Sequence, residues 1–151
     1  MNRIVYDADR IGPWVCERTG GVYDGLGTAM GIERDGYLIG AVLFDNYNGR
    51  SICIHVASNG TGHWITPEFL RQVFHYPFIQ LGVSVIIGQV DSTNLAAMKF
   101  DMALGFKLEH VIPDAGKFGD LVILTMRPAQ CRFLKLKERH HRRQIERTPG
   151  T

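Results

Sequence analysis

The sequence has few cysteines, no long apolar run and no large excess of charge of one sign. Its three cysteines, Cys16, Cys53 and Cys131, are odd in number and far apart, which argues against a disulfide-built scaffold and predicts free thiols in a reducing compartment. No histidine lies at a metal-ligand spacing from them, so we expect no metal site. No stretch approaches the roughly 20 apolar residues that cross a bilayer, and residues 1–7 do not resemble a signal peptide. We therefore expect a soluble, cytoplasmic protein without a membrane segment.

The apolar content that is present suffices for one folded domain, since 45% of the 151 residues are hydrophobic and 21% are charged. The net charge of +2 is unevenly distributed, because Arg132–Arg147 carries a net +5 and the remainder −3. Such a basic segment can bind nucleic acid or a ribonucleoprotein, although a solvated helix or tail is more common. We divide the chain into a domain at 1–128 and a basic C-terminal helix or tail at 129–151. The His140-His141 pair in that tail lacks further metal ligands.

The first part of the chain has the pattern of an antiparallel meander. A short strand is expected at 3–6, followed by a short helix that begins at Pro13 and stops at Gly20. Further strands are expected at 29–33, 37–44 and 51–57. The dipeptide Asp35-Gly36 favours the positive φ angles of a tight hairpin between the first two of these strands.

The second part of the chain alternates helices and strands. Apolar spacing from 66 to 81 predicts a helix that Pro77 interrupts, and the continuous apolar run at 83–90 predicts a strand buried on both faces. A second helix is expected at 94–104, with closing strands at 106–112 and 121–127. A meander followed by this alternation predicts an α/β (α+β) domain in which helices flank a mixed sheet.

The stretch ASNGTGHWITPEFL at 57–70 connects a strand to a helix through a glycine-bearing turn. Thr66 as N-cap and Pro67 at the first helical position mark where the helix begins. A helix start presents unpaired N–H groups and the positive end of the helix dipole, and Gly60 and Gly62 let the backbone approach a ligand. The stretch is either a phosphate site or a simple turn, since a Gly-x-Gly pair alone is weak evidence.

A longer segment carries a family resemblance. The sequence NLAAMKFDMALGF at 94–106, the Leu81-Gly82 pair and the closing run GDLVILTM at 119–126 follow the meander in a fixed order. In this order they resemble the GCN5-related N-acetyltransferase (GNAT) family over about residues 32 to 127. The resemblance implies a mostly antiparallel central sheet flanked by helices.

The resemblance also implies where the cofactor lies. Acetyl-CoA would occupy a V-shaped gap between the strands at 51–57 and 83–90, with its pyrophosphate on the loop before the helix at 66. The implied cofactor-binding residues are Val56, Ala57, Gly62, His63, Trp64, Ile65, Thr66 and Asn94. Asn94 also fits the N-cap of the helix that follows it.

The loop before that helix departs from the family pattern. The family's (Gln/Arg)-x-x-Gly-x-(Gly/Ala) falls on 61–66, where Thr61, Trp64 and Thr66 replace the polar opener and the two small residues. Backbone N–H groups do not depend on the side chains, and His63 adds a donor. We expect the Trp64 side chain to point away from the pyrophosphate.

Three side chains are candidates for proton transfer. His55, on the strand beside the acetyl group, is the expected base, with Glu33 on a neighbouring strand as the second choice; each also fits a purely structural role. Asp101 stands where the family often has a tyrosine that protonates the leaving thiolate, a role that requires a strongly raised pKa. Cys53 shares a strand face with His55, but a small core cysteine is favoured over a nucleophile.

These residues predict an N-acetyltransferase that transfers an acetyl group from acetyl-CoA to an amine by direct attack in a ternary complex. The alternative is a non-catalytic protein of the same fold that binds nucleic acid or a protein partner through Arg132–Arg147. A third hypothesis is an enzyme whose acceptor is nucleic acid or an RNA–protein particle. The short region at 6–29 favours an open groove and a large acceptor, while the sequence leaves the acceptor and the oligomeric state, a homodimer included, undetermined.

Overall fold

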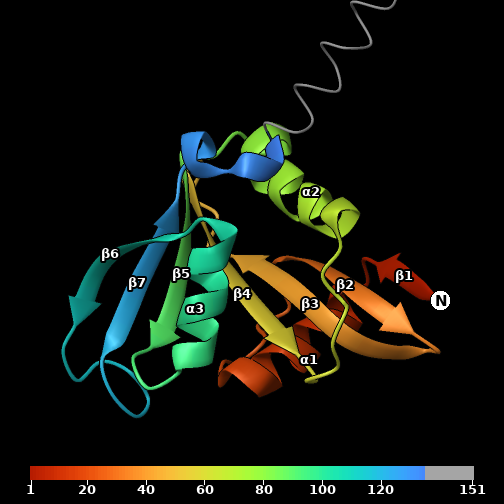
Figure 1. Ribbon diagram of the computed structural model, residues 1–151, viewed down its shortest axis with the longest axis horizontal. Coiled ribbons are helices and arrows are strands. Elements are labelled where there is room, and N and C mark those ends of the chain that lie inside the picture. Colours follow the sequence, from red (N-terminus) through yellow and green to blue (C-terminus); the bar gives the residue numbers. More distant parts are fainter. Residues whose placement is uncertain (135–151) are drawn as a thin grey trace, which may run out of the picture.

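The structure is a computed structural model that describes residues 1–134 (Figure 1). The expected basic segment Arg132–Arg147 lies outside this range apart from its first three residues, as does the His140-His141 pair. The described chain folds into one seven-stranded sheet with helices packed on both faces. No helix among the described residues has the length and apolarity needed to cross a membrane.

All the expected strands and helices are present. The strands are β1 (Asn2–Val5), β2 (Thr28–Arg34), β3 (Tyr37–Asp45), β4 (Ser51–Ser58), β5 (Val85–Asp91), β6 (Lys107–Ile112) and β7 (Leu121–Met126). The helices are α1 (Ala8–Thr19), α2 (Pro67–His75) and α3 (Leu95–Leu104), with a π-helical turn η1 (Tyr76–Gln80) and a 3-10 turn η2 (Pro128–Gln130). This order confirms the predicted α/β (α+β) class.

The strand order across the sheet is β1-β2-β3-β4-β5-β7-β6. Every neighbouring pair is antiparallel except β4 and β5, which run parallel. The exception arises because the chain returns from β4 to β5 through α2, and parallel neighbours require such a crossover. The mixed, mostly antiparallel sheet is therefore confirmed.

Two apolar clusters pack the helices against opposite faces of this sheet. α1 buries Ile11 and Val15 with Leu43 of β3, whereas α2 buries Phe69 with Val42 of the same strand. Successive residues of a strand point to opposite faces, so α1 and α2 cover different sides of the sheet. Phe100 of α3 packs against the cluster that contains α2.

Helix α1 begins earlier than its proline predicts. The expected start at Pro13 is wrong: the helix begins at Ala8, and the Asp7 side chain accepts a hydrogen bond from the Arg10 N–H as its N-cap. Pro13 lies inside the helix, where it removes one backbone donor. The apolar contacts of α1 with the sheet hold the helix in place around it, and the helix ends as expected at Gly20, with φ +83°.

Pro77 interrupts the second helix in the predicted place. α2 ends at His75, and the chain continues as a π-helical turn in which the Leu81 N–H donates to the Tyr76 carbonyl over 3.0 Å. Because proline has no N–H, the regular helical hydrogen bond at residue 77 cannot form, and the wider turn accommodates this.

Strand β5 is buried on one face only, which corrects the expectation of burial on both faces. Ile86, Gly88 and Val90 are buried, but Ile87 is half-buried and Gln89 is exposed. The reason is that α1 packs on β2, β3 and β4, and among residues 1–134 no helix covers the α1 side of β5 to a comparable extent.

The packed domain extends past residue 128. Cys131 is fully buried and Phe133 is 6% exposed, and the Phe133 ring stacks on Phe74 of α2 with 5.2 Å between centroids. The start of the segment assigned to the tail is therefore part of the core.

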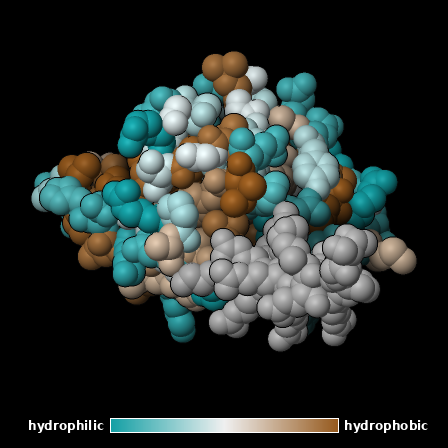
Figure 2. Space-filling view, turned by 90° about the horizontal axis from the view of Figure 1, so that it is seen from above, coloured by the Kyte–Doolittle hydropathy of each residue, from teal (hydrophilic) through white to brown (hydrophobic). Residues whose placement is uncertain are grey.

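On the face seen from above, apolar and polar residues are intermingled at the surface (Figure 2).

Candidate active site

The two parallel strands diverge and form an opening. Ser51–Ile54 of β4 pairs with Val85–Gly88 of β5, and the pairing then stops although β4 continues to Ser58. Figure 1 shows the two strands separating like the arms of a V. Val56 and Ala57 lie on the diverged part of β4, where the edge that faces β5 has no strand partner in the part of the chain that the structure describes. An extended ligand with amide groups can hydrogen-bond along such an edge.

The loop that follows β4 presents free backbone donors. Its entry is shaped by the Asn59 side chain, which accepts from the Thr61 N–H over 2.9 Å, and its exit by Thr66. Thr66 Oγ1 accepts from the Phe69 N–H over 3.1 Å, which confirms Thr66 as the N-cap of α2. The N–H groups of residues 62–65 have no hydrogen-bond acceptor among residues 1–134. A run of free donors at a helix start is suited to an anion.

The Trp64 side chain points into the protein. It is 8% exposed, and its ring lies so close to Gly40 of β3 that a Cβ at residue 40 would overlap the indole. The ring also stacks on Phe100 of α3 with 6.3 Å between centroids and meets the edge of Phe69 at 5.9 Å. Trp64 therefore points away from the solvent side of the loop and into the space between the helices and the sheet.

That space is a small apolar recess beside the opening. Its lining comes from β3 and β4, from the loop, from α2 and from α3: Val42, Ile54, Val56, Trp64, Phe69 and Phe100 are among the lining residues. The recess lies on the α2 side of the sheet, because Val42 and Phe69 belong to the same apolar cluster. Its apolar walls suit an aliphatic chain better than a charged group.

Asn94 acts as a helix cap. Its side-chain oxygen accepts from the Ala97 N–H over 3.1 Å at the start of α3. The turn before it is held by Asp91, whose carboxylate accepts from the Thr93, Phe118 and Gly119 N–H groups. These hydrogen bonds, that of Phe118 foremost, hold the pKa of Asp91 well below its usual value. Contact between Asn94 and a cofactor stays a prediction.

His55 has a carboxylate partner that the sequence did not reveal. Its Nε2 lies 2.9 Å from Oδ1 of Asp45, and both side chains are only partly exposed, at 29% and 27%. The pair forms because Leu43 of β3 is the cross-strand partner of His55, which places Asp45 two residues away on the same face of the sheet. A carboxylate on one ring nitrogen orients the imidazole and leaves the other nitrogen available for proton transfer.

Cys53 is close to this pair but is not activated. Asp45 is its cross-strand partner, and Cys53 is half-buried on the same strand face as His55. Burial, and secondarily the negative charge of Asp45, raises the pKa of the Cys53 thiol. A thiol that holds its proton is a poor nucleophile, so a structural role is the better interpretation.

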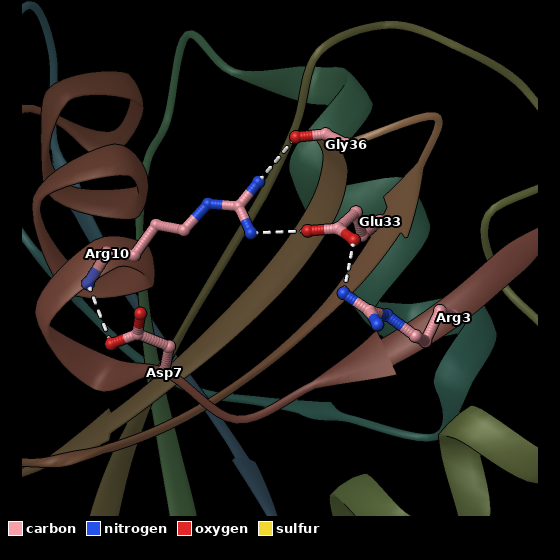
Figure 3. A network of polar contacts seen from close by, with 5 residues as sticks. All are labelled: Arg3, Asp7, Arg10, Glu33 and Gly36. Carbon is pink, nitrogen blue, oxygen red and sulfur yellow. Dashed lines mark hydrogen bonds and ion pairs between the residues drawn. The ribbon is translucent and has the colours of Figure 1, made fainter.

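Glu33 is held in an ion-pair network instead of being available as a base (Figure 3). Its buried carboxylate pairs with Arg10 of α1 and, at 2.7 Å, with Arg3 of β1. The hydrogen bond from Arg10, with that from Arg3, lowers the pKa of Glu33, although burial opposes this. Arg10 also donates to the Gly36 carbonyl. The network ties α1 to the first hairpin, and it argues against the proposed base role of Glu33.

Burial shifts the pKa of Asp101 in the direction that a proton donor needs. Burial raises its pKa from 3.8 to about 6. It lies on the side of α3 that turns inward, one turn from Leu104, and next to Phe100, which contacts Trp64. An aspartic acid with a pKa of about 6 is mostly protonated below that pH and keeps a minor protonated fraction at neutral pH.

The fold of this domain is that of known acetyltransferases. No protein-family model matches the sequence, and no curated protein matches it significantly. Among solved structures, mutant forms of the spermidine/spermine N-acetyltransferase SpeG from Vibrio cholerae superpose with a TM-score of 0.65 at 16% identity, over 89% of this chain and 98% of that one. An N-acetyltransferase from Staphylococcus aureus Mu50 gives 0.65 at 15% identity, over 84% and 98%.

A further solved structure, described as a probable acetyltransferase, gives a TM-score of 0.58 at 22% identity. The match covers 68% of this chain and spans only 63% of that one. At these identities the matches establish the shared fold, in agreement with the resemblance carried by residues 94–106.

Proposed function

We propose that the protein is an N-acetyltransferase that uses acetyl-CoA as the acetyl donor and an amine as the acceptor. The observation that carries the proposal is the run of free N–H groups at residues 62–65, directly before α2 and beside the divergence of β4 and β5. An acetyltransferase fold with an anion site at the mouth of an extended opening fits a ligand with a pyrophosphate and a long arm.

The residues present suit both ends of such a donor. The N–H groups of Gly62, His63, Trp64 and Ile65 would hold the pyrophosphate, with the positive end of the α2 dipole behind them. The free edge of β4 at Val56–Ala57 would hold the amide groups of the pantetheine arm. Bound acetyl-CoA would supply the thioester whose C–S bond breaks as the amine nitrogen forms the new C–N bond.

His55 and Asp101 are assigned the two proton transfers. His55, oriented by Asp45, takes the proton that the amine nitrogen loses as it becomes an amide. Asp101 gives its proton to the departing sulfur and regains one from solvent. His55 lies on the α1 side of the sheet, so the amine approaches from that side, opposite to the recess that Trp64 fills.

Titration calorimetry with acetyl-CoA tests the donor site. We expect saturable binding and a rise in unfolding free energy of about 2.7 kcal/mol when the ligand is at a hundred times its dissociation constant. Dephosphorylated pantetheine should bind much more weakly, because it lacks the pyrophosphate. Absence of binding at millimolar acetyl-CoA would refute the proposal. Release of free thiol in the presence of spermidine or a lysine peptide then tests the transfer itself.

Gly62→Val is a clean probe of the anion site. The φ angle of Gly62 does not lie in the left-handed region and a Cβ there meets open space, so we expect valine to crowd the ligand without a clash in the free protein. We expect acetyl-CoA binding to weaken by about 1–3 kcal/mol, the usual scale for disturbing a specific polar contact. Thr61→Val, which adds no bulk at residue 62, is the matched control and should bind normally.

A second candidate function follows from the charge of the C-terminal segment. The net +5 of Arg132–Arg147 favours binding of nucleic acid or a ribonucleoprotein, either by a non-catalytic protein or by an enzyme whose acceptor is such a particle. Acetyl-CoA binding separates the two versions, since a non-catalytic protein has no need of a donor site.

A further inference from the structure

The indole of Trp64 crosses the region where β4 and β5 have diverged. Gly40, which it covers, is the cross-strand partner of Ser58 at the far end of β4, beyond the last pair of β4 with β5. On its other side the ring stacks on Phe100 of α3. The side chain therefore reaches from β3 to α3 across the diverged part of β4, next to Val56 in the recess.

The protein is shaped to receive the indole there. Residue 40 is a glycine, and any larger residue would overlap the ring. Phe69 and Phe100 contact it edge-on and face-on, and only 8% of the residue is exposed. Aromatic rings in these arrangements attract one another beyond simple burial, so the indole is a stable occupant of the recess.

The backbone around Trp64 has few attachments by comparison. His63 has a left-handed φ of +64°, and the N–H groups of Gly62 and Trp64 on either side of it have no acceptor among the described residues. Its carbonyl receives one long contact, 3.5 Å from Asn2 Nδ2. A non-glycine residue with positive φ next to unpaired backbone groups can change conformation without breaking a hydrogen-bond ladder.

We propose that Trp64 is a gate on the acetyl-CoA site: its indole occupies the passage of the pantetheine arm in the free protein and leaves the recess when the donor binds. This inference rests on the proposed function. The aliphatic arm then replaces the indole against Val56 and Phe100, and the closed state lowers the apparent affinity by the fraction of molecules that are open.

Tryptophan fluorescence reports the gate directly. The chain has two tryptophans, and Trp14 on α1 lies under the Arg18 guanidinium and packs against the α1 cluster, whereas Trp64 belongs to the cluster on the opposite face of the sheet. In Trp14→Phe, Trp64 is the single emitter. We expect emission typical of a buried indole that shifts to longer wavelength as acetyl-CoA is added, with the midpoint at the calorimetric dissociation constant. Calorimetric binding without any change in emission would overturn the gate and leave the proposed function intact.

Two substitutions test the gate through affinity. Trp64→Gly removes the indole and should bind acetyl-CoA at least tenfold more tightly than the parent. Trp64→Phe keeps a smaller aromatic ring in the recess, so its affinity should lie between those of the parent and Trp64→Gly. Gly40→Ala should expel the indole, giving long-wavelength emission without ligand and tighter binding. Circular dichroism checks that each variant is folded, and binding is measured below room temperature to keep destabilised variants folded. If Trp64→Gly is unfolded, the affinities of Trp64→Phe and Gly40→Ala test the gate.

The outcomes separate the two proposals. Binding by Trp64→Gly or Gly40→Ala that equals or falls below that of the parent overturns the gate alone. Failure of the parent and of all three variants to bind overturns the proposed function, and the gate with it. Binding by the variants but not by the parent supports a gate that is closed almost completely.

Discussion

At the scale of single residues, burial of Asp101 predicts the direction in which the free energy of unfolding changes with pH. Its folded-state pKa of about 6 exceeds the 3.8 of the exposed group, so the folded protein holds this proton more tightly than the unfolded chain. Stability is therefore lost as pH rises from about 4 to about 6, and the penalty is constant above that.

Asp101→Asn should remove this penalty, because asparagine does not ionise. We expect the variant to be more stable than the parent at pH 8 by at most about 3 kcal/mol, from 1.36 kcal/mol per pKa unit, and little different at pH 4. Urea unfolding at pH 4, 6 and 8 measures the difference. A gain that is the same at all three pH values would mean that Asp101 is solvated, and its assignment as proton donor would fail.

The His55–Asp45 pair predicts a graded loss of turnover. His55→Gln should lower kcat by about 10²–10⁴-fold, the usual contribution of a general base, while acetyl-CoA binds as before. Asp45→Asn keeps a polar partner but removes the charge, so its kcat should fall less. Steady-state kinetics between pH 6 and 9 test this, with Cys53→Ser as the matched control on the same strand face. Unchanged turnover in His55→Gln would give the histidine a structural role only.

The sequence identifies His55 as a candidate base, but it does not show that Asp45 is its hydrogen-bond partner. His55 follows from the strand pattern of residues 51–57 and from the residue type, both of which are local. Asp45 becomes its partner only through the register of β3 with β4, ten residues away in the chain. The ion pairs of Glu33 could not be predicted for the same reason, because its two arginine partners come from other elements.

At the scale of elements, the sequence predicts helix ends where a capping residue is present. Thr66 and Asn94 both cap the helices that they were expected to begin, and Gly105 ends α3 with a left-handed φ of +117°. The predicted start of α1 at Pro13 was wrong because proline is common in the first turn of a helix, whereas the actual N-cap, Asp7, lies six residues earlier. The buried position of the Trp64 side chain could not be predicted from the neighbouring sequence, because it depends on the absence of a side chain at Gly40 on β3.

The first turn of α2 carries a negative charge at the proposed anion site. Glu68 favours the helix through the dipole but repels a pyrophosphate bound at the same end. Glu68→Gln should therefore tighten acetyl-CoA binding while it lowers the unfolding free energy by about 0.3–1 kcal/mol. Calorimetry at low and high salt measures the first effect, which should shrink with salt. Glu17→Gln on α1, an exposed residue, should change neither quantity; weaker binding by Glu68→Gln would argue against an anion at this helix start.

At the scale of the whole molecule, charge is divided between the domain and its C-terminal segment. The fold accounts for the start of that segment, because Cys131 and Phe133 are part of the core. From the sequence, the remainder holds most of the +5 of Arg132–Arg147, against −3 elsewhere. The distribution of charged residues predicted this asymmetry and the order of strands and helices predicted the fold class, whereas the boundary between core and tail depends on the contact of Phe133 with Phe74.

Removal of residues 138–151 tests whether the basic segment binds nucleic acid. A cut after Lys137 spares Cys131 and Phe133 and deletes four arginines, so the domain should remain folded and bind acetyl-CoA as the full chain does. If those arginines neutralise phosphates, the full chain should bind duplex nucleic acid with a steeper salt dependence than the truncated chain. The slope of log K against log salt should differ by up to about 3.6, from 0.9 per phosphate contact. Fluorescence anisotropy with a labelled duplex between 50 and 200 mM salt, on the order of the range over which such contacts are lost, measures both slopes. Equal slopes would mean that the charge of these arginines plays no part in binding, and the nucleic-acid alternative would lose its only support.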